Sequence, residues 1–364
     1  MNEYLCTLIS NMTKEHEERI IHDLKDWKKL IKPYASPETK LAWKQIFNTI
    51  LPFVGVFIAA AIVYDYSRIA TLLISIIGGL FLTRVFIIQH DCGHQAFFPD
   101  RKKNDRTGFI TSFLTCIPYK YWARSHNHHH AHQGQLDTRT IGDVNLLTVR
   151  EYEALSKSAK FKYRIYRSFP VMFIIGPAYY IFIHNRIPFI TLKGWDKERK
   201  MLLLTNLYLV LFFAVVGIIL CLPNFDLIYG FKKLAFIYIP ILLTFVFTAI
   251  WFFYMQHQHN PNYKAWKKDW EYVLAAIKGS SYYKLPAILN FFTGNIGYHH
   301  LHHLAPKIPF YKLHKCSNEN PVFQKHVSEI TFWGSLKYAF YTLWDEENNR
   351  MVKFSQLKKI RVKS

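Results

Sequence analysis

Eighteen histidines occur in the 364 residues, and several recur at a spacing suited to metal binding. The pattern HxxHH occurs at residues 126–130 and again at 299–303, and HDCGH covers residues 90–94. On a helix, residues three or four positions apart lie on one face, so each motif directs two or three imidazoles the same way. Neutral imidazole is a good ligand for iron, zinc, copper and nickel. The three motifs therefore predict a histidine-rich metal site.

The number of histidines favours two metal ions rather than one. A catalytic zinc site usually takes three protein ligands, whereas the motif positions supply eight histidines and His257 directly follows the last long apolar segment. Asp91 is the one carboxylate within the motifs, and we interpret it as an outer partner that orients a ligating imidazole. Redox-active iron suits this donor set, and the spacing alone leaves zinc open. A single motif could be a solvated histidine-rich tract, but three together favour a metal centre.

Four long apolar segments could bring these motifs to one side of a membrane. Each is about as long as the ~20 residues that an α-helix needs to cross the hydrocarbon core. The segments are residues 46–64, 69–89, 201–222 and 234–256. The alternative, buried helices of a soluble protein, is disfavoured by the presence of four such segments. Two shorter apolar runs, residues 109–118 and 169–183, fall below a comfortable span, so we expect re-entrant or interfacial elements there.

Two features of the second segment predict how it packs. Gly78 and Gly79 carry no side chain, so we expect a neighbouring helix to approach closely at this point. Arg84 is the only charged residue of the segment. We expect its long side chain to extend toward the nearer membrane surface.

The distribution of basic residues predicts which side of the membrane the motifs face. The chain has 46 Lys and Arg against 25 Asp and Glu, a formal net charge of +21. The basic residues lie almost entirely in residues 1–45, 90–200 and 256–364. The exceptions are Arg68, Arg84, Lys232 and Lys233. If only the four long segments cross, these regions share one side, and the positive-inside rule makes that side the cytosol.

All three histidine motifs then face the cytosol, close to the ends of the apolar segments. The short connections near residues 65–68 and 223–233 would face the opposite side. A further crossing by residues 169–183 would instead separate the third motif from the first two. The basic surface could also attract anionic lipid headgroups. Nucleic acid is a weaker explanation for it, because the sequence has no recognised nucleic-acid-binding motif.

Composition supports the same fold class. Apolar residues make up 51% of the chain and charged residues only 20%, which argues against a soluble enzyme. The five cysteines lie far apart, without the pattern of a disulfide framework or a zinc site. We expect an all-α membrane protein with four transmembrane helices, two re-entrant or interfacial segments and a cytosolic helical cap that carries the histidine motifs. The expected organisation is a cytosolic N-terminal segment (1–45), a membrane domain (46–315) and a cytosolic C-terminal tail (316–364).

The motifs and their surroundings resemble those of one enzyme family over roughly residues 40–315. The matching stretches are HDCGHQAFF (90–98), HNHHHAHQGQLDTRTIGDV (126–144), QHQ (256–258), GSSYYKLP (279–286) and TGNIGYHHLHHLAPKIPFYKL (293–313). In order and spacing they are similar to the integral-membrane fatty acid desaturases, in particular the acyl-lipid type that includes the omega-6 (Δ12) enzymes.

The resemblance implies a di-iron centre that is held by nine histidines and that acts on the substrate. The implied metal ligands, and thereby the catalytic residues, are His90, His94, His126, His129, His130, His257, His299, His302 and His303. Asp91 and Asn295 are candidates for an outer shell around these ligands, although Asn295 could equally serve a turn beside Gly294. The remaining histidines of the motif regions, His128, His132, His259 and His300, are interpreted as bystanders or outer partners. His132 and His259 depart from the family pattern, which leaves room for an altered site.

The activity implied by the resemblance is an O2-dependent oxidation of a fatty acyl chain bound to a membrane lipid. An unactivated alkyl chain offers neither an acidic proton nor a carbonyl group, so an oxidising metal centre is needed to form the cis double bond. Two electrons must come from a separate donor of the ferredoxin or cytochrome b5 type, because the sequence has no GxGxxG, CxxCH or HPGG motif. The basic cytosolic surface would attract an acidic donor.

Two other functions remain open on the motifs. A hydroxylase or ketolase would use the same oxidant on the same class of substrate. A histidine-rich protein that binds or transports metal would be no enzyme, but a transporter places its ligands near the middle of the membrane. We expect a multi-pass protein with its active site on the cytosolic side. A bacterial inner membrane is favoured over the endoplasmic reticulum, because the terminal Val-Lys-Ser is not a retrieval signal.

Overall fold

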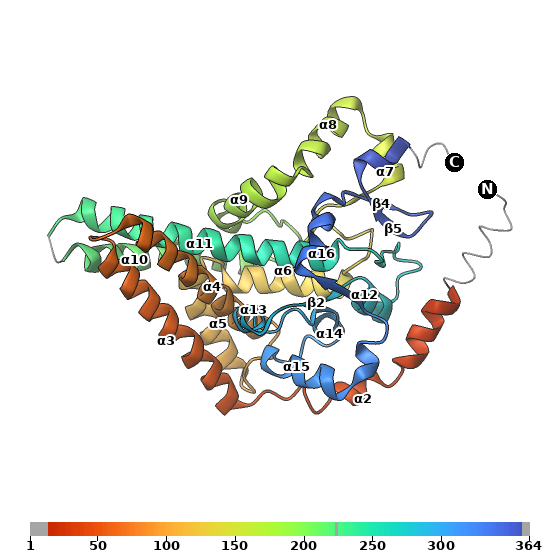
Figure 1. Ribbon diagram of the computed structural model, residues 1–364, viewed down its shortest axis with the longest axis horizontal. Coiled ribbons are helices and arrows are strands. Elements are labelled where there is room, and N and C mark those ends of the chain that lie inside the picture. Colours follow the sequence, from red (N-terminus) through yellow and green to blue (C-terminus); the bar gives the residue numbers. More distant parts are fainter. Residues whose placement is uncertain (1–13, 223–224, 359–364) are drawn as a thin grey trace.

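Four long helices dominate the computed structural model, which describes residues 14–222 and 225–358 (Figure 1). Each of them is long and apolar enough to cross a membrane. They are α3 (Thr39–Val63), α4 (Arg68–Gly93), α10 (Asp196–Cys221) and α11 (Leu227–His257). The prediction of an all-α membrane protein is therefore confirmed. Residues 1–13 and 359–364, from the predicted N-terminal segment and C-terminal tail, lie outside the described residues.

The spanning helices extend beyond the apolar segments that predict them. Helix α3 begins at Thr39 rather than at residue 46, and α4 continues past residue 89 to Gly93, so the first histidine motif forms its last turn. Helix α11 begins at Leu227, which makes most of the predicted 223–233 connection helical, with residues 223–224 outside the described part. Helical hydrogen bonds persist among polar residues at a membrane surface, whereas the apolar pattern stops there.

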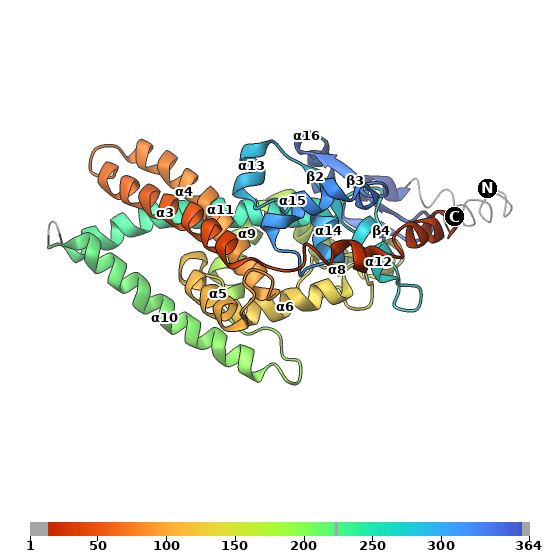
Figure 2. The same cartoon turned by 90° about the horizontal axis from the view of Figure 1, so that it is seen from below.

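Helix α4 packs against both α3 and α11, whereas α10 packs against α11 and lies below the other spanning helices in Figure 2. A Cβ atom placed on Gly79 would lie 2.4 Å from Cβ of Thr244 and 2.8 Å from the carbonyl oxygen of Ile241. Only a glycine therefore lets the backbones of α4 and α11 approach this closely. The packing role predicted for the Gly78–Gly79 pair is confirmed.

Arg84 of α4 does not reach the membrane surface, so the prediction for its side chain is wrong. Only 5% of the residue is exposed. Its guanidinium donates hydrogen bonds to Oγ1 of Thr49 (3.1 Å), Oε1 of Gln45 (2.6 Å) and the carbonyl oxygen of Phe291. The cation also lies 4.1 Å from the ring centroid of Phe291. Internal acceptors thus replace the water that an extended side chain would have reached.

The two shorter apolar runs do not form additional spans. Most of residues 109–118 belongs to α5 (Arg101–Thr115), whereas residues 169–183 form a π-helix, η1 (Val171–Ile175), followed by α9 (Gly176–Phe182). Among the described residues, only the four long helices have the length and composition of a membrane span. The crossing number therefore stays even between the second and third histidine motifs.

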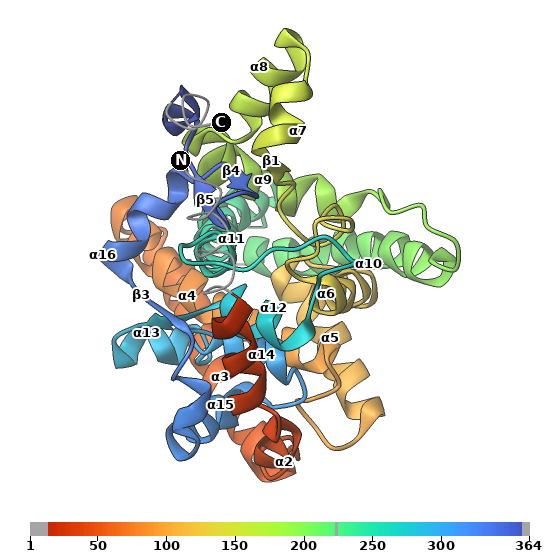
Figure 3. The same cartoon turned by 90° about the vertical axis from the view of Figure 1, so that its right-hand side faces the viewer.

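The remaining helices form a cap at one end of the bundle and an arm beside it. In Figure 3, viewed from the cap, α6, α12 and α14 lie near the centre. In Figure 1, α8 and α9 form the arm above α11. The α-helices are α2 (Trp27–Ile31), α6 (Tyr119–His132), α7 (Val149–Ala154), α8 (Lys157–Tyr166), α12 (Tyr272–Lys278), α13 (Ala287–Phe292), α14 (His299–Leu304), α15 (Phe310–Glu319) and α16 (Phe332–Ser335). The 3-10 turns are η2 (His184–Arg186), η3 (Pro321–Phe323), η4 (Leu336–Phe340) and η5 (Phe354–Gln356).

Two small sheets fasten the chain after residue 316 to the cap. Strand β2 (Ser281–Lys284) pairs in parallel with β3 (Ser328–Thr331). Strand β4 (Leu343–Asp345) lies between β1 (Leu147–Thr148) and β5 (Arg350–Val352). Trp344 of β4 is buried. These strands hold the loops around the histidine-bearing helices.

Candidate metal centre

The histidines of the three motifs converge on two adjacent groups in the cap. In the first group, called group 1, the ligand atoms all lie within 4.8 Å of one another. Group 1 contains His90, His94, His126, His130 and His302. The same criterion joins His129, His257 and His303. His299 adjoins these three, because its Nε2 lies 2.9 Å from that of His257 and 3.1 Å from that of His303, and the four form group 2. All nine histidines expected from the sequence thus lie in one of the two groups.

Helical spacing explains how the two HxxHH motifs divide their histidines. On α6, His126 and His130 are four residues apart and both enter group 1, while the intervening His129 enters group 2. Helix α14 does the reverse, since it places His302 in group 1 and the pair His299 and His303 in group 2. The rings of His130 and His303 stack with centroids 4.1 Å apart, so the two groups touch.

Burial keeps these imidazoles in the neutral form that binds metal. His302 and His303 are each only 1% exposed. Burial is the main cause that lowers the pKa of His94, His130, His302 and His303 well below the usual histidine value. Metal ligation requires the neutral ring, whose second nitrogen carries a free electron pair.

The donor set fits metal ions better than it fits a hydrogen-bonded core. In group 1, Nε2 of His130 lies 3.0 Å from Nε2 of His126 and 3.1 Å from Nε2 of His302. The buried Nε2 of His94 has no hydrogen-bond partner among the described residues. Neutral imidazoles that meet nitrogen to nitrogen cannot all donate to one another. A cation between these rings could accept the lone pairs of the facing Nε2 atoms. Imidazole is a suitable ligand for iron, zinc and copper.

Outer partners fix the orientation of several rings. Oδ1 of Asp91 lies 3.0 Å from Nδ1 of His90, and its Oδ2 accepts a 2.6 Å hydrogen bond from the backbone N–H of Phe310. Nδ1 of His257 lies 3.3 Å from the carbonyl oxygen of Gly279. Acceptors beside Nδ1 favour the tautomer in which Nε2 is free to face the group.

Two outer partners were missed by the sequence reasoning. Oδ2 of Asp143 lies 3.7 Å from Nδ1 of His129. Gln133, one residue after α6, donates a 2.7 Å hydrogen bond to the carbonyl oxygen of Gly279, which in turn faces His257. Asp143 lies within the stretch that resembles the desaturases and has apolar neighbours in the sequence. A carboxylate in such a setting could have been recognised as a possible partner of a motif histidine. Nothing in the sequence indicates such a role for Gln133, because the carbonyl group that it bonds belongs to Gly279, far away along the chain.

The other residues considered from the sequence lie outside both groups. Asn295 adopts a left-handed backbone conformation (φ 57°), and its Nδ2 donates to the carbonyl oxygen of Phe310 at 3.4 Å. This geometry favours the turn role over an outer partner of a histidine. His128 and His132 stack on each other with centroids 4.2 Å apart. His259 and His300 are fully buried but belong to neither group.

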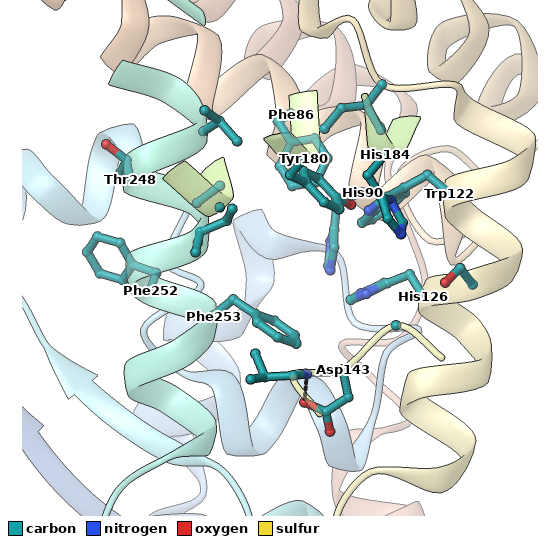
Figure 4. Close-up of a pocket in the computed structure, with 18 of the residues that line it drawn as sticks. Phe86, His90, Trp122, His126, Asp143, Tyr180, His184, Thr248, Phe252 and Phe253 are labelled. Atoms are coloured by element: carbon teal, nitrogen blue, oxygen red, sulfur yellow. Dashed lines mark hydrogen bonds between the residues drawn. The ribbon is translucent and has the colours of Figure 1, made fainter. Parts of the chain in front are cut away.

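A mostly apolar cavity of about 570 Å³ reaches the histidines. His90 and His126 of group 1 and His299 of group 2 form part of its wall. Figure 4 shows His90 and His126 beside Trp122, with Phe86 and Phe253 around the same space. The volume falls within the ~300–1,000 Å³ typical of small-molecule sites. The cavity is therefore large enough for an apolar small molecule, and its wall includes histidines of both groups.

Comparison with known proteins decides the family. A sequence profile for fatty acid desaturases matches residues 66–333. A fatty acid desaturase of Bacillus subtilis (strain 168) is 42% identical over 347 residues, which cover 95% of each chain. The chain belongs to the fatty acid desaturase family.

More distant desaturases share the same region of the chain. An sn-2 acyl-lipid omega-3 desaturase (ferredoxin), chloroplastic, of Arabidopsis thaliana is 26% identical over 305 residues, which cover 80% of this chain and 64% of the relative. An sn-1 oleoyl-lipid 12-desaturase of Anabaena variabilis is 26% identical over 235 residues, which cover 65% of this chain and 64% of the relative. The family is thus an oxidoreductase family, and the histidine groups and the apolar cavity lie within the matched residues.

Proposed function

We propose that this desaturase introduces a cis double bond into the acyl chain of a membrane lipid, with O2 as co-substrate. The observation that carries the proposal is the meeting of nine histidines in two groups, three of which, His90, His126 and His299, line one apolar cavity. Group 1 and group 2 would each hold one iron ion. The bound iron pair would supply the oxidising power to remove two hydrogens from neighbouring methylenes. The overall reaction would consume one saturated –CH2–CH2– unit, O2, two electrons and two protons. It would yield one carbon–carbon double bond and two water molecules.

The chain's own residues would bind and position the reactants. Asp91, Asp143 and the Gly279 carbonyl hold the rings of His90, His129 and His257 in place. The apolar wall, with Phe86, Trp122 and Phe253, would keep water away from the reacting methylenes. It would also fix which pair of carbons lies beside His90, His126 and His299. A displacement of about 1 Å can cost ~100-fold in rate, so wall shape would set the double-bond position.

For the position, we propose an omega-6 (Δ12-like) enzyme. The Anabaena relative is named for desaturation of an oleoyl lipid at position 12, while the Arabidopsis relative is an omega-3 enzyme. The electrons would come from a separate donor of the ferredoxin or cytochrome b5 type, and the name of the Arabidopsis relative includes ferredoxin. No cofactor-binding motif of the sequence replaces such a donor.

We also propose that both histidine groups face the cytosol of a bacterium. Four spans leave the cap on one side, together with nearly all Lys and Arg of the chain. The bacterial assignment is supported by the Bacillus relative, which matches 95% of this chain.

The direct test is expression in a host whose lipids contain only saturated and monounsaturated chains. Mass spectrometry should then find diunsaturated chains with a new double bond at the omega-6 position. His302→Ala should abolish the product at an unchanged protein level in the membrane, because His302 belongs to group 1. His128→Ala is the matched control and should retain activity, because His128 lies outside both groups. Hydroxylated or keto products would show a hydroxylase or a ketolase in place of the proposed activity. An active His302→Ala variant would refute the assignment of His302 as a metal ligand.

A further inference from the structure

The cavity beside the histidines is open along the arm formed by α8, η1 and α9. Ile175 and Tyr179 both line the cavity, yet 58% of Ile175 and 43% of Tyr179 is exposed on the molecular surface. Tyr166 at the end of α8 also lines the cavity and is exposed. These three side chains therefore form a rim through which a ligand can pass between the surface and the interior.

The surface outside this rim is apolar. Ile174, Phe182 and Ile183 are exposed next to the rim residues, and Ile187 and Phe189 continue the exposed apolar surface after η2. Contiguous apolar patches of this kind mark protein or membrane contacts rather than water. Helix α9 packs against the spanning helix α11, so this patch adjoins the membrane-spanning surface. This position favours an opening toward lipid over one toward water.

Helix α8 has the composition of a helix that lies at a membrane surface. It carries Lys157, Lys160, Lys162 and Arg164, interleaved with exposed Phe161 and Ile165. Such helices sit with their apolar side chains at the boundary of headgroups and hydrocarbon, and their Lys and Arg side chains attract anionic lipid headgroups. We therefore place the lipid headgroups at the level of α8. The rim residues Ile175 and Tyr179 belong to η1 and α9, which follow α8 in the same arm (Figure 1).

A π-helical turn shapes the wall at the opening. Val171, Met172, Ile175 and Gly176 of η1 and the start of α9 all line the cavity. The backbone N–H of Gly176 donates to the carbonyl oxygen of Val171, and a Cβ on Gly176 would lie only 2.8 Å from that oxygen. Short π-helical turns inside helices frequently mark functional sites.

We propose that the acyl chain of a bilayer glycerophospholipid enters the cavity sideways, between Tyr166, Ile175 and Tyr179. The phosphate headgroup stays outside, at the level of the basic residues of α8. The lipid does not leave the membrane during this step, whereas a water-soluble thioester would not enter by this route. This inference rests on the proposed function, because it takes the bound lipid to be the substrate. Binding of the lipid itself requires neither iron, O2 nor an electron donor.

The test is photo-crosslinking of the metal-free protein in vesicles of phosphatidylcholine and phosphatidylglycerol. A small fraction of the lipid carries a diazirine at the middle of one acyl chain, and a parallel sample receives the same labelled chain as a coenzyme A thioester. Mass spectrometry of the digested protein should find lipid attached to the interior side chains of Phe86, Trp122 or Phe253.

Three variants show whether the rim is the route. Ile175→Trp should lower lipid labelling of the interior roughly tenfold, because the larger side chain fills the opening. Ile174→Trp is the matched control, since Ile174 is equally exposed but does not line the cavity, and labelling should be unchanged. Ile175→Ala widens the opening and should keep or increase the labelling, which separates blockage from misfolding.

The inference is overturned if Ile174→Trp and Ile175→Trp give equal interior labelling. It is also overturned if the thioester labels the interior and the lipid labels only the outer faces of the helices. In either case the desaturase function can still be measured separately by its products.

Discussion

At the scale of single residues, the two HxxHH motifs share one spacing but serve opposite groups. The motif on α6 gives two histidines to group 1 and one to group 2, and the motif on α14 gives one and two. Each group is therefore built from at least two separate parts of the chain. A shift of either helix would disturb both groups together, which couples the two proposed iron sites.

Asp91 is expected to matter through His90 rather than by contact with the metal. In Asp91→Asn the side chain keeps one oxygen, so either His90 or the N–H of Phe310 must face an amide NH2 group. Loss of such an outer partner typically costs about 10–100-fold in metal affinity. Iron titration of the purified variant should show a reduction in this range.

The matched control for Asp91 is Asp269→Asn, because the carboxylate of Asp269 is exposed and pairs with Lys268 at 3.9 Å, away from both histidine groups. This variant should bind iron like the unmodified protein. Equal iron affinity of Asp91→Asn and Asp269→Asn would show that Asp91 does not support His90.

The sequence predicts the nine histidines of the groups but not how they are divided or supported. Spacing along a helix is local, so His126, His129 and His130 can be recognised in the sequence. The neighbours of a ring are set by tertiary packing, which is why Gln133 and the Gly279 carbonyl were missed. Arg84 was misjudged for the same reason, since its acceptors come from α3 and from the end of α13.

At the scale of the elements, α4 connects the packing of the spanning helices to the histidine groups. It carries His90 and is followed by His94, and it packs against α11, which carries His257. The close approach at Gly79 sets the separation of these two helices. Hydropathy predicts that both helices exist, but the π-helix η1, the short strands and the extended helix ends depend on packing that no apolar pattern records.

Gly79→Ala should destabilise the protein and loosen the metal centre. The new Cβ would lie 2.4 Å from Cβ of Thr244, and overpacking of this kind costs about 1–3 kcal/mol of unfolding free energy. Thermal unfolding in detergent and the iron content of the purified protein should both decrease.

Gly55→Ala is the matched control on α3, because no atom lies within 4 Å of a Cβ at that position. Its unfolding temperature should be unchanged or slightly higher, since alanine favours a helix over glycine. A Gly79→Ala variant as stable as Gly55→Ala would contradict the close packing of α4 on α11.

At the scale of the whole molecule, an even number of crossings in the described residues keeps the segment before α3, the cap and the segment after α11 on one side. The α3–α4 connection at Tyr66 lies at the other end of the spanning helices from the 258–271 loop of the cap. Labelling of intact bacteria with a membrane-impermeant maleimide should therefore modify Tyr66→Cys at once. Lys268→Cys should react only after the cells are broken.

The four native cysteines in the described residues are buried, and Cys6 lies outside those residues, so the labelling of each variant is read against the unmodified protein. Tyr66 and the side chain of Lys268 are 85% and 80% exposed, so access to the reagent depends on the side of the membrane. The unmodified protein serves as the background. Labelling of Lys268→Cys in intact cells would reverse the proposed orientation.

The central claim is that nine histidines hold two iron ions, one in each group. The most direct measurement is iron content combined with X-ray absorption at the iron edge on the purified, iron-loaded desaturase. We expect two irons per chain, with imidazole nitrogen as the main protein donor bound to iron and with no sulfur ligand. One metal per chain, zinc as the ion retained in active protein, or a shell dominated by carboxylate would contradict it.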